Sequence, residues 1–199
     1  YNAVYLDSLK SYFFNSESKN IKLDQNNIQT EMQLNILAIR DLLYFQGYVY
    51  GIQSGGLFKF NPRTFEPINF QQIYGLIGFT EYKNQLVFAT STGIRILKNG
   101  EMEKPASKSE LFQKPLLGIQ KLNDSLLLAN TDGSGSYITD LEQSWLLPQS
   151  SFLSVENAFV EKNHIWLATE LGIYKYERKN GTYEIQQKID DNDGLPSKK

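Results

Sequence analysis

The sequence predicts an all-β fold built from repeated four-stranded antiparallel sheets, and three observations carry this prediction. Tyr, Phe and Trp make up 13% of the 199 residues, and aromatic residues favour strands. A pattern of two strands joined by a glycine-containing turn occurs four times. Its closing glycines are Gly56, Gly93, Gly135 and Gly172, which are 37, 42 and 37 residues apart. A period of about 40 residues with four short strands is typical of a β-propeller blade.

Each repeat follows the same order of elements. An apolar strand comes first, at residues 36–45, 76–82, 116–122 and 155–160. The hairpin follows and is clearest at residues 164–176, with its turn at Glu170–Gly172. A weaker fourth strand comes last, as at Thr182–Gln187 after Asn180-Gly181, a dipeptide typical of two-residue hairpin turns. We therefore expect about four antiparallel strands in each unit.

Two segments have helical character. Residues 34–45 have loosely spaced aliphatic positions that fit a helix, but the repeat register favours a strand. Residues 108–114 are expected to form one helical turn with Ser109 as its cap.

The turn between the second and third strands is expected to require a glycine that tolerates positive φ. A small residue before this turn, Ala89, Ala129 or Ala168, fits a crowded position between packed sheets, and Ile52 takes this place in the first repeat. The third repeat carries about two extra residues, around Asp132-Gly133.

The repeats also predict the domain organisation. The units span about residues 31–70, 71–112, 113–150 and 151–190. Residues 1–30, with strands at 3–6 and 10–14, resemble the last two strands of an earlier blade, and residues 191–199 resemble the start of another. We therefore expect residues 1–199 to be one partial propeller of about four full blades plus a partial one.

Composition excludes several function classes. The 20 basic and 22 acidic residues give a net charge of −2, so the chain lacks the excess of basic residues that is typical of nucleic-acid-binding proteins. The absence of cysteine excludes thiol chemistry and zinc–thiolate sites. The single histidine, His164, excludes multi-histidine metal sites. Residues 190–194, DDNDG, do not fit a calcium loop, because Ile189 takes the first ligand position. We expect no metal, cofactor, nucleic-acid partner or catalytic residue in this segment.

The end of the fourth unit resembles the two-component regulator propeller repeat. The matching residues form an apolar-Trp-apolar-small-Thr strand, a Gly-Ile turn, an aromatic strand and a final Asp-Gly-Leu-Pro-Ser. They are Trp166, Ala168, Thr169, Gly172, Ile173, Tyr174, Tyr176, Asp193, Gly194, Leu195, Pro196 and Ser197. The second unit matches through Ala89-Thr90 and Gly93, and the first and third match in outline.

This resemblance implies a periplasmic sensor region of a hybrid two-component histidine kinase of the kind common in Bacteroidetes. Such regions typically recognise oligosaccharides and control polysaccharide-utilisation genes. The resemblance implies that sensor chains associate with one another and that the membrane is reached only through a larger parent chain. It also implies that the segment is not itself an enzyme.

The sequence gives three candidate ligand-binding residues. Trp145 lies in a variable segment, Leu141–Pro148, where its ring could stack on a sugar or pack between blades. Asp132 and Ser134 lie in the turn insertion, which could bind a ligand or be an ordinary turn. Trp166, in contrast, lies in the repeated strand and is expected to fill the core. Two alternative functions remain open, a glycan lyase or hydrolase propeller and a protein-docking propeller.

Overall fold

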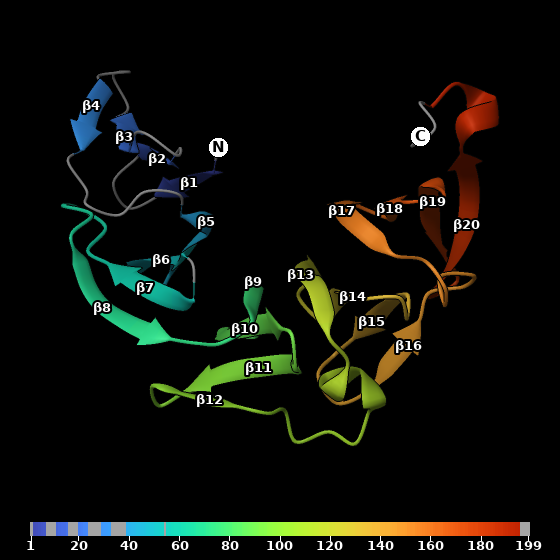
Figure 1. The fold of residues 1–199 in the computed structure, drawn as a ribbon, viewed down its shortest axis with the longest axis horizontal. Helices are drawn as coiled ribbons and strands as arrows, with labels where there is room; N and C mark the ends of the chain where they lie inside the picture. The colour runs from blue at the N-terminus through green and yellow to red at the C-terminus, as the bar shows by residue number, and fades with distance from the viewer. Residues whose placement is uncertain are drawn as a thin grey trace. The chain divides into compact units, whose positions relative to one another are not determined.

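We describe the protein from a computed structural model, in which residues 2–6, 11–15, 20–23, 29–32, 39–53 and 55–195 are described. These residues form five four-stranded antiparallel sheets, each with its strands in chain order (Figure 1). The chain divides into two compact units, Tyr1–Gly78 and Phe79–Lys199. In the described part of the chain, no helix is both long enough and apolar enough to cross a bilayer. The predicted all-β fold is confirmed.

The first sheet corrects the prediction for residues 1–30. Its strands are β1 (Asn2–Leu6), β2 (Ser11–Asn15), β3 (Asn20–Leu23) and β4 (Gln29–Met32). The segments at 3–6 and 10–14 are therefore the first two strands of a complete sheet rather than the last two of a remnant. The sequence did not reveal β3 and β4, because each has only four residues. The alternation in β3 is limited to Ile21 and Leu23, and β4 has none.

The second sheet completes the first unit. Its strands are β5 (Arg40–Phe45), β6 (Tyr48–Gln53), β7 (Gly56–Phe60) and β8 (Pro67–Gln72). The strand predicted at residues 36–45 is confirmed for residues 40–45, and residues 36–38 lie outside the described residues. The core of this sheet contains Ile39, Val49, Phe60 and Phe65, and the Phe58 ring lies between Phe60 and Phe70, at centroid distances of 5.7 and 4.6 Å. Apolar and aromatic residues alternating along the strands thus bury one face of the sheet.

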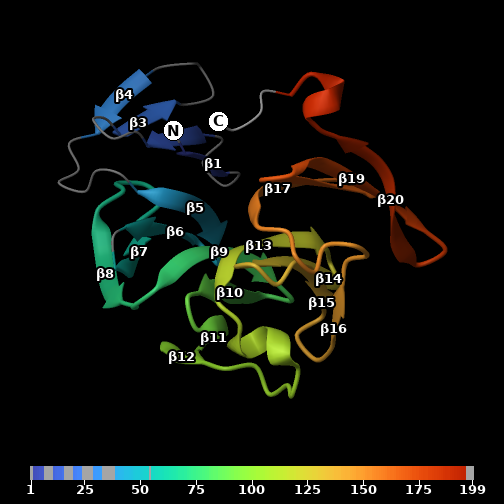
Figure 2. The same cartoon turned by 45° about the vertical axis from the view of Figure 1, so that its right-hand side comes forward.

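The remaining sheets contain the other repeats (Figure 2). The third consists of β9 (Leu76–Tyr82), β10 (Gln85–Thr90), β11 (Gly93–Lys98) and β12 (Glu101–Glu103), and the division between the units falls within β9. The fourth consists of β13 (Leu116–Asn123), β14 (Leu126–Thr131), β15 (Ser136–Thr139) and β16 (Ser144–Leu146). The fifth consists of β17 (Val155–Glu161), β18 (His164–Thr169), β19 (Gly172–Lys179) and β20 (Thr182–Ile189).

The fourth and fifth sheets pack face to face around one apolar cluster. Leu128 and Ile138 of the fourth sheet face Ile165, Leu167 and Tyr176 of the fifth. In both β14 and β18, every second side chain points to the same face, as the pleat of a strand requires. This packing positions the site described below.

The repeated glycines lie at the turn between the second and third strands. The chain at the end of the fourth strand, or just beyond it, passes close to this turn. Gly93, Gly135 and Gly172 have φ of +108°, +86° and +121°, which confirms the prediction of positive φ. A Cβ on these residues would meet the backbone carbonyls of Phe112, Ser150 and Ile189, respectively. Each of these positions therefore requires glycine for two reasons, its positive φ and the neighbouring backbone carbonyl that leaves no room for a Cβ.

The first repeat departs from this pattern. The positive φ of +88° belongs to Gly55, and Gly56 has no positive φ. A Cβ on Gly56 would nevertheless lie 2.5 Å from the carbonyl oxygen of Gln71. The prediction of positive φ is thus wrong for Gly56, whereas the need for a residue without a side chain holds.

A threonine at the end of the second strand closes the same turn. The hydroxyls of Thr90, Thr131 and Thr169 donate to the carbonyls of Gly93, Gly135 and Gly172 at 2.7, 2.6 and 2.8 Å. We call the end of each sheet that carries this turn the glycine end, and the other the opposite end. The threonine that ends the second strand thus closes the turn through its side-chain hydroxyl.

The threonine also corrects the alignment of the third repeat. The Thr131 amide donates to the Gly135 carbonyl at 3.0 Å, so Thr131 is the counterpart of Thr169. Asn130, rather than Ala129, therefore takes the place of Ala168. The turn of residues 132–134 has one more residue than the two-residue turn at Glu170-Leu171, instead of about two more.

The described residues include two short 3-10 helices. The first, η2 (Glu110–Gln113), confirms the helical turn, but the Ser109 side chain makes no capping bond and contacts the Ser144 hydroxyl instead. The second, η3 (Asp191–Asp193), has a capping box and ends at Gly194, which has a φ of +92°. The Asp190 carboxylate accepts from the Asn192 amide at 3.0 Å, so the acidic run caps a helix. Pro196 lies outside the described residues.

Candidate ligand-binding site

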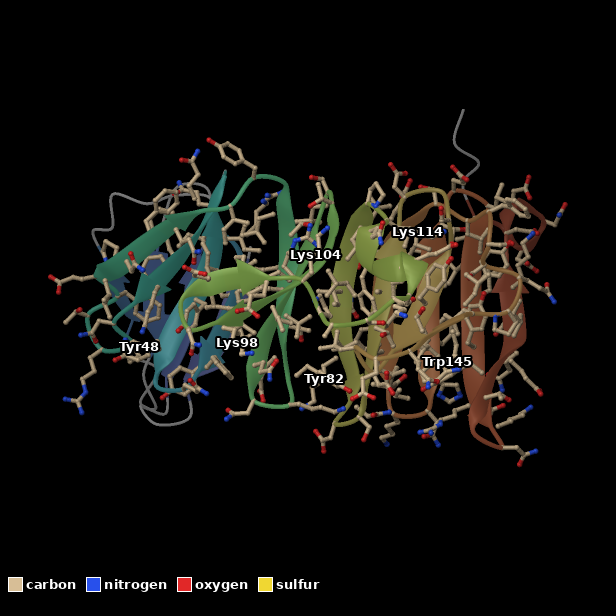
Figure 3. All side chains as sticks on the ribbon, turned by 90° about the horizontal axis from the view of Figure 1, so that it is seen from below. Tyr48, Tyr82, Lys98, Lys104, Lys114 and Trp145 are labelled. Atoms are coloured by element: carbon tan, nitrogen blue, oxygen red, sulfur yellow. The ribbon has the colours of Figure 1, made fainter. Side chains whose placement is uncertain are left out.

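The three candidate ligand residues do not form one site. Asp132 and Ser134 lie in the β14–β15 turn, at the glycine end of the fourth sheet. Trp145 lies on β16, paired with Ile138 on β15, and it faces a cavity that reaches the β19–β20 turn at the opposite end. In Figure 3, Trp145 and Tyr82 lie toward one end of the second unit and Lys114 toward the other. The structure therefore separates Trp145 from the turn insertion.

Trp145 forms one wall of a cavity of about 320 Å³ between the fourth and fifth sheets. The lining residues come from β14, β15, β16, the segment that follows β16, the β19–β20 turn and the start of β20. They are Leu126, Ile138, Trp145, Leu146, Leu147, Pro148, Gly181, Thr182 and Tyr183. The Trp145 side chain is 48% exposed, although Ile138 and Leu147 beside it are buried. A large apolar ring is thus held open to solvent against a buried aliphatic wall.

The position of Trp145 follows from the pleat of the fourth sheet. Leu128 pairs with Ile138, and Ile138 pairs with Trp145, so the three side chains form one row on the face toward the fifth sheet. β16 has three residues, whereas β20 has eight, so the outer strands of the two sheets differ in length. We attribute the cavity to this difference, because the short strand does not cover the row at its outer end.

Two buried tyrosines join the sheets near this cavity. The Tyr176 hydroxyl on β19 donates to the carbonyl of Pro148, a lining residue, at 3.0 Å. The Tyr82 hydroxyl on β9 donates to the carbonyls of Ser125 and Asp140 at 2.6 and 3.3 Å. Both tyrosine side chains are buried. They tie β9 and β19 to the segments that flank the cavity.

Burial raises the pKa of Tyr176 to about 12, and the nearby Tyr174 adds a smaller increase. An unfolded tyrosine ionises near pH 10, so the unfolded chain loses this proton first as the pH rises. We predict that Tyr176 leaves the free energy of unfolding unchanged below about pH 10 and lowers it progressively between about pH 10 and 12. Urea unfolding across this pH range, compared with a Tyr176→Phe variant, measures the effect. The prediction would be contradicted if, above about pH 10, the free energy of unfolding of the wild type fell with pH no more steeply than that of Tyr176→Phe.

The described lining of the cavity contains no Asp, Glu, Lys, Arg or His. Its side-chain polar groups are the Trp145 indole N–H and the hydroxyls of Thr182 and Tyr183. The Thr182 hydroxyl donates to the Lys179 carbonyl at 3.0 Å and keeps oxygen lone pairs that can accept. The Lys179 ammonium is itself paired with Glu177 at 3.1 Å. The arrangement supports stacking and apolar contact with a neutral group.

Trp166 is half-buried instead of filling the core. It lies on the face of the fifth sheet directed away from the fourth, with the Lys175 ammonium 4.9 Å from the centroid of its ring. Phe159, its cross-strand neighbour, is 62% exposed. The strand pattern predicts that Trp166 alternates with Ile165 and Leu167, but the pattern alone does not say which face is covered.

Sequence reasoning missed a buried polar network at the glycine end of the fourth sheet. The Ser136 hydroxyl donates to the Asn130 side chain at 2.8 Å, and the Ser150 hydroxyl accepts from the Ser136 amide at 3.1 Å. All three residues are buried. The network ties the β14–β15 hairpin to the segment that leads into β17, so the insertion at Asp132 and Ser134 is anchored by structural contacts.

No protein-family model and no curated protein matches the chain, whereas solved structures do. A streptogramin B lyase matches with a TM-score of 0.68 and 16% identity over 93% of this chain and 67% of the lyase. PorZ, a surface component of the type-IX secretion system of Porphyromonas gingivalis, matches with a TM-score of 0.67 and 15% identity. The fold is that of a β-propeller.

A third match is the extracellular domain of BT4673 from B. thetaiotaomicron, a protein assigned to a one component system. Its TM-score is 0.68 at 11% identity. This chain is covered to 92% in both the PorZ and the BT4673 matches but spans only 26% and 27% of those chains. At these identities the likeness shows the propeller fold alone.

Proposed function

We propose that the protein is a ligand-sensing propeller segment of an extracytoplasmic sensor, and that a sugar unit of an oligosaccharide binds beside Trp145. The half-exposed Trp145 ring on the wall of a cavity carries this proposal. The resemblance of residues 165–197 to the two-component regulator propeller repeat supports a sensor, as does the match to the extracellular domain of BT4673. In this proposal the segment binds its ligand and does not transform it.

The proposed contact uses the two surfaces of a sugar ring. Its C–H face is apolar and suits the Trp145 ring, because aromatic side chains combine a large apolar surface with a polar group at one end. A cavity of about 320 Å³ lies at the lower end of the usual range for small-ligand sites. It would accept one terminal unit, and the rest of an oligosaccharide would extend into solvent.

Signalling would follow from the position of the cavity between two sheets. A ligand there touches both β16 and β20, so its affinity depends on how the two sheets are arranged. A ligand shifts an equilibrium between two arrangements only as far as it binds them with different free energy. We propose that this difference is passed to paired sensor chains, to a cytoplasmic histidine kinase in the parent protein, and finally to polysaccharide-utilisation genes.

We predict that Trp145→Ala weakens oligosaccharide binding by roughly tenfold or more, because truncating a central aromatic contact typically has an effect of this size. The chain has two tryptophans, so a Trp166→Phe background makes Trp145 the only indole. Its fluorescence can then be titrated with an oligosaccharide panel. Isothermal calorimetry measures oligosaccharide binding by the Trp145→Ala variant, which lacks the Trp145 fluorescence.

Phe152→Ala is the matched control, because Phe152 is 86% exposed and does not line the cavity. It should bind like the parent protein. Equal binding by Trp145→Ala would contradict the site. Saturable binding to another protein with no response to any sugar would favour the docking alternative, and turnover of a glycan would favour the enzyme alternative.

A further inference from the structure

The cavity has two chemically different parts. Its inner wall includes the buried side chains of Ile138, Leu147 and Tyr183, next to the partly buried Leu126. Its mouth includes the exposed residues Trp145 and Thr182. A bound group therefore meets aliphatic carbon and one phenol ring inside, and an aromatic face and a hydroxyl at the entrance.

The lack of cationic side chains in the lining makes the cavity selective for neutral groups. The described lining has no cationic side chain, and the ammonium of Lys179, three residues before Thr182, is already paired with Glu177. Arg178 pairs across the strands with Tyr183, but it is exposed and does not line the cavity. A carboxylate that entered the cavity would lose water without gaining a cationic partner from the lining, which is unfavourable. The lining thus disfavours acidic sugars.

Hydroxyl groups are restricted in a similar way. The Thr182 oxygen can accept a hydrogen bond at the mouth, whereas Leu126, Ile138 and Leu147 offer only aliphatic side chains inside. A sugar stacked on Trp145 can direct its ring hydroxyls to the mouth and one exocyclic carbon to the inner wall. If that carbon is a methyl group, it is buried favourably. If it is a hydroxymethyl group, its hydroxyl loses water and finds no partner among Leu126, Ile138 and Leu147, so it must turn toward the Tyr183 hydroxyl to be paired.

We infer that the cavity selects a neutral 6-deoxyhexose unit, with its methyl group against Leu126, Ile138 and Leu147 and its ring on Trp145. This inference rests on the proposed function and specifies its ligand. Burial of one methyl group corresponds to about a fourfold gain in affinity. Removal of the unpaired hydroxyl adds to this gain, so we expect roughly a tenfold preference for the deoxy sugar over the hexose.

The test uses sugars that differ only at carbon 6. The Trp166→Phe protein is titrated with methyl glycosides of 6-deoxyglucose, glucose and glucuronic acid, and with the corresponding galactose and mannose series. Trp145 fluorescence is the signal. We expect the deoxy sugar of at least one series to bind about tenfold more tightly than its hexose, and the uronic acid of that series to bind most weakly.

A charge variant provides an independent measurement. Leu126 is partly exposed at the start of β14, so Leu126→Lys places an ammonium at the wall of the cavity without emptying the core. This variant should gain affinity for the uronic acid and lose its preference for the deoxy sugar, and Leu126→Met serves as the uncharged control.

The outcomes separate the two proposals. Equal or tighter binding of the hexose or the uronic acid to the parent protein would overturn this inference and leave the proposed function standing. Failure of every sugar to bind, in both the monosaccharide series and the oligosaccharide panel, would overturn both.

Discussion

Replacing Gly93 with alanine is expected to destabilise the second unit by about 4 kcal/mol. A φ of +108° lies outside the region that residues with a side chain adopt easily, and such strain costs on the order of 1–3 kcal/mol. The new Cβ would also meet the Phe112 carbonyl, and a clash in a packed site adds roughly 1–3 kcal/mol. Urea unfolding followed by circular dichroism measures the loss.

Gly100→Ala separates these two causes. Gly100 has a φ of +85°, but a Cβ there would meet no atom within 4 Å. Its variant should lose only about 1 kcal/mol, the cost of a side chain at positive φ. Losses of equal size in the two variants would show that backbone conformation, and not close approach to Phe112, requires glycine at position 93.

Tyr176→Ala is expected to have a comparable effect, with a loss of about 4 kcal/mol. The change removes a fully buried ring from the cluster between the fourth and fifth sheets, and truncation of a buried aromatic residue typically costs about 3–5 kcal/mol. It also removes the hydrogen bond to Pro148, so the cavity wall should loosen and ligand affinity should fall.

Tyr176→Phe divides this effect into its parts. The ring remains and only the hydroxyl is lost, so the expected cost is about 1 kcal/mol, the usual contribution of one hydrogen bond. Phe152→Ala, at an exposed position in the same unit, should change the free energy of unfolding little. If Tyr176→Phe were as unstable as Tyr176→Ala, the hydrogen bond rather than the packing would hold the sheets together.

The sequence predicted the strands of the repeats because alternation and turn chemistry are local properties. β9, β13 and β17 begin at Leu76, Leu116 and Val155, the expected positions. β3 and β4 were not predicted, because a segment of four residues carries too little pattern, and its pairing with neighbouring strands has no local signal.

The candidate binding site was harder to predict from the sequence than the strands. Trp145 was a candidate because it lies outside the repeated pattern, and the structure places it on a cavity wall. The other walls include residues from β14 and the start of β20, which are more than 50 positions apart in the chain. Their proximity depends on the packing of two sheets. A single sequence therefore indicated the ring but could not indicate the aliphatic wall behind it.

The glycine turns at the two ends of the sheets differ in how well they tolerate substitution. At the glycine end, Gly93 and Gly172 lie against passing backbone, so substitutions there threaten the fold. At the opposite end, Gly100 and Gly181 have open space around them, and Gly181 belongs to the cavity. Mutation can therefore explore new ligand preferences at one end while the other preserves the architecture. A library that randomises Lys179 and Thr182, and keeps Asn180 and Gly181 with their positive φ, should yield mostly folded proteins, and selection from it is a direct route to altered specificity.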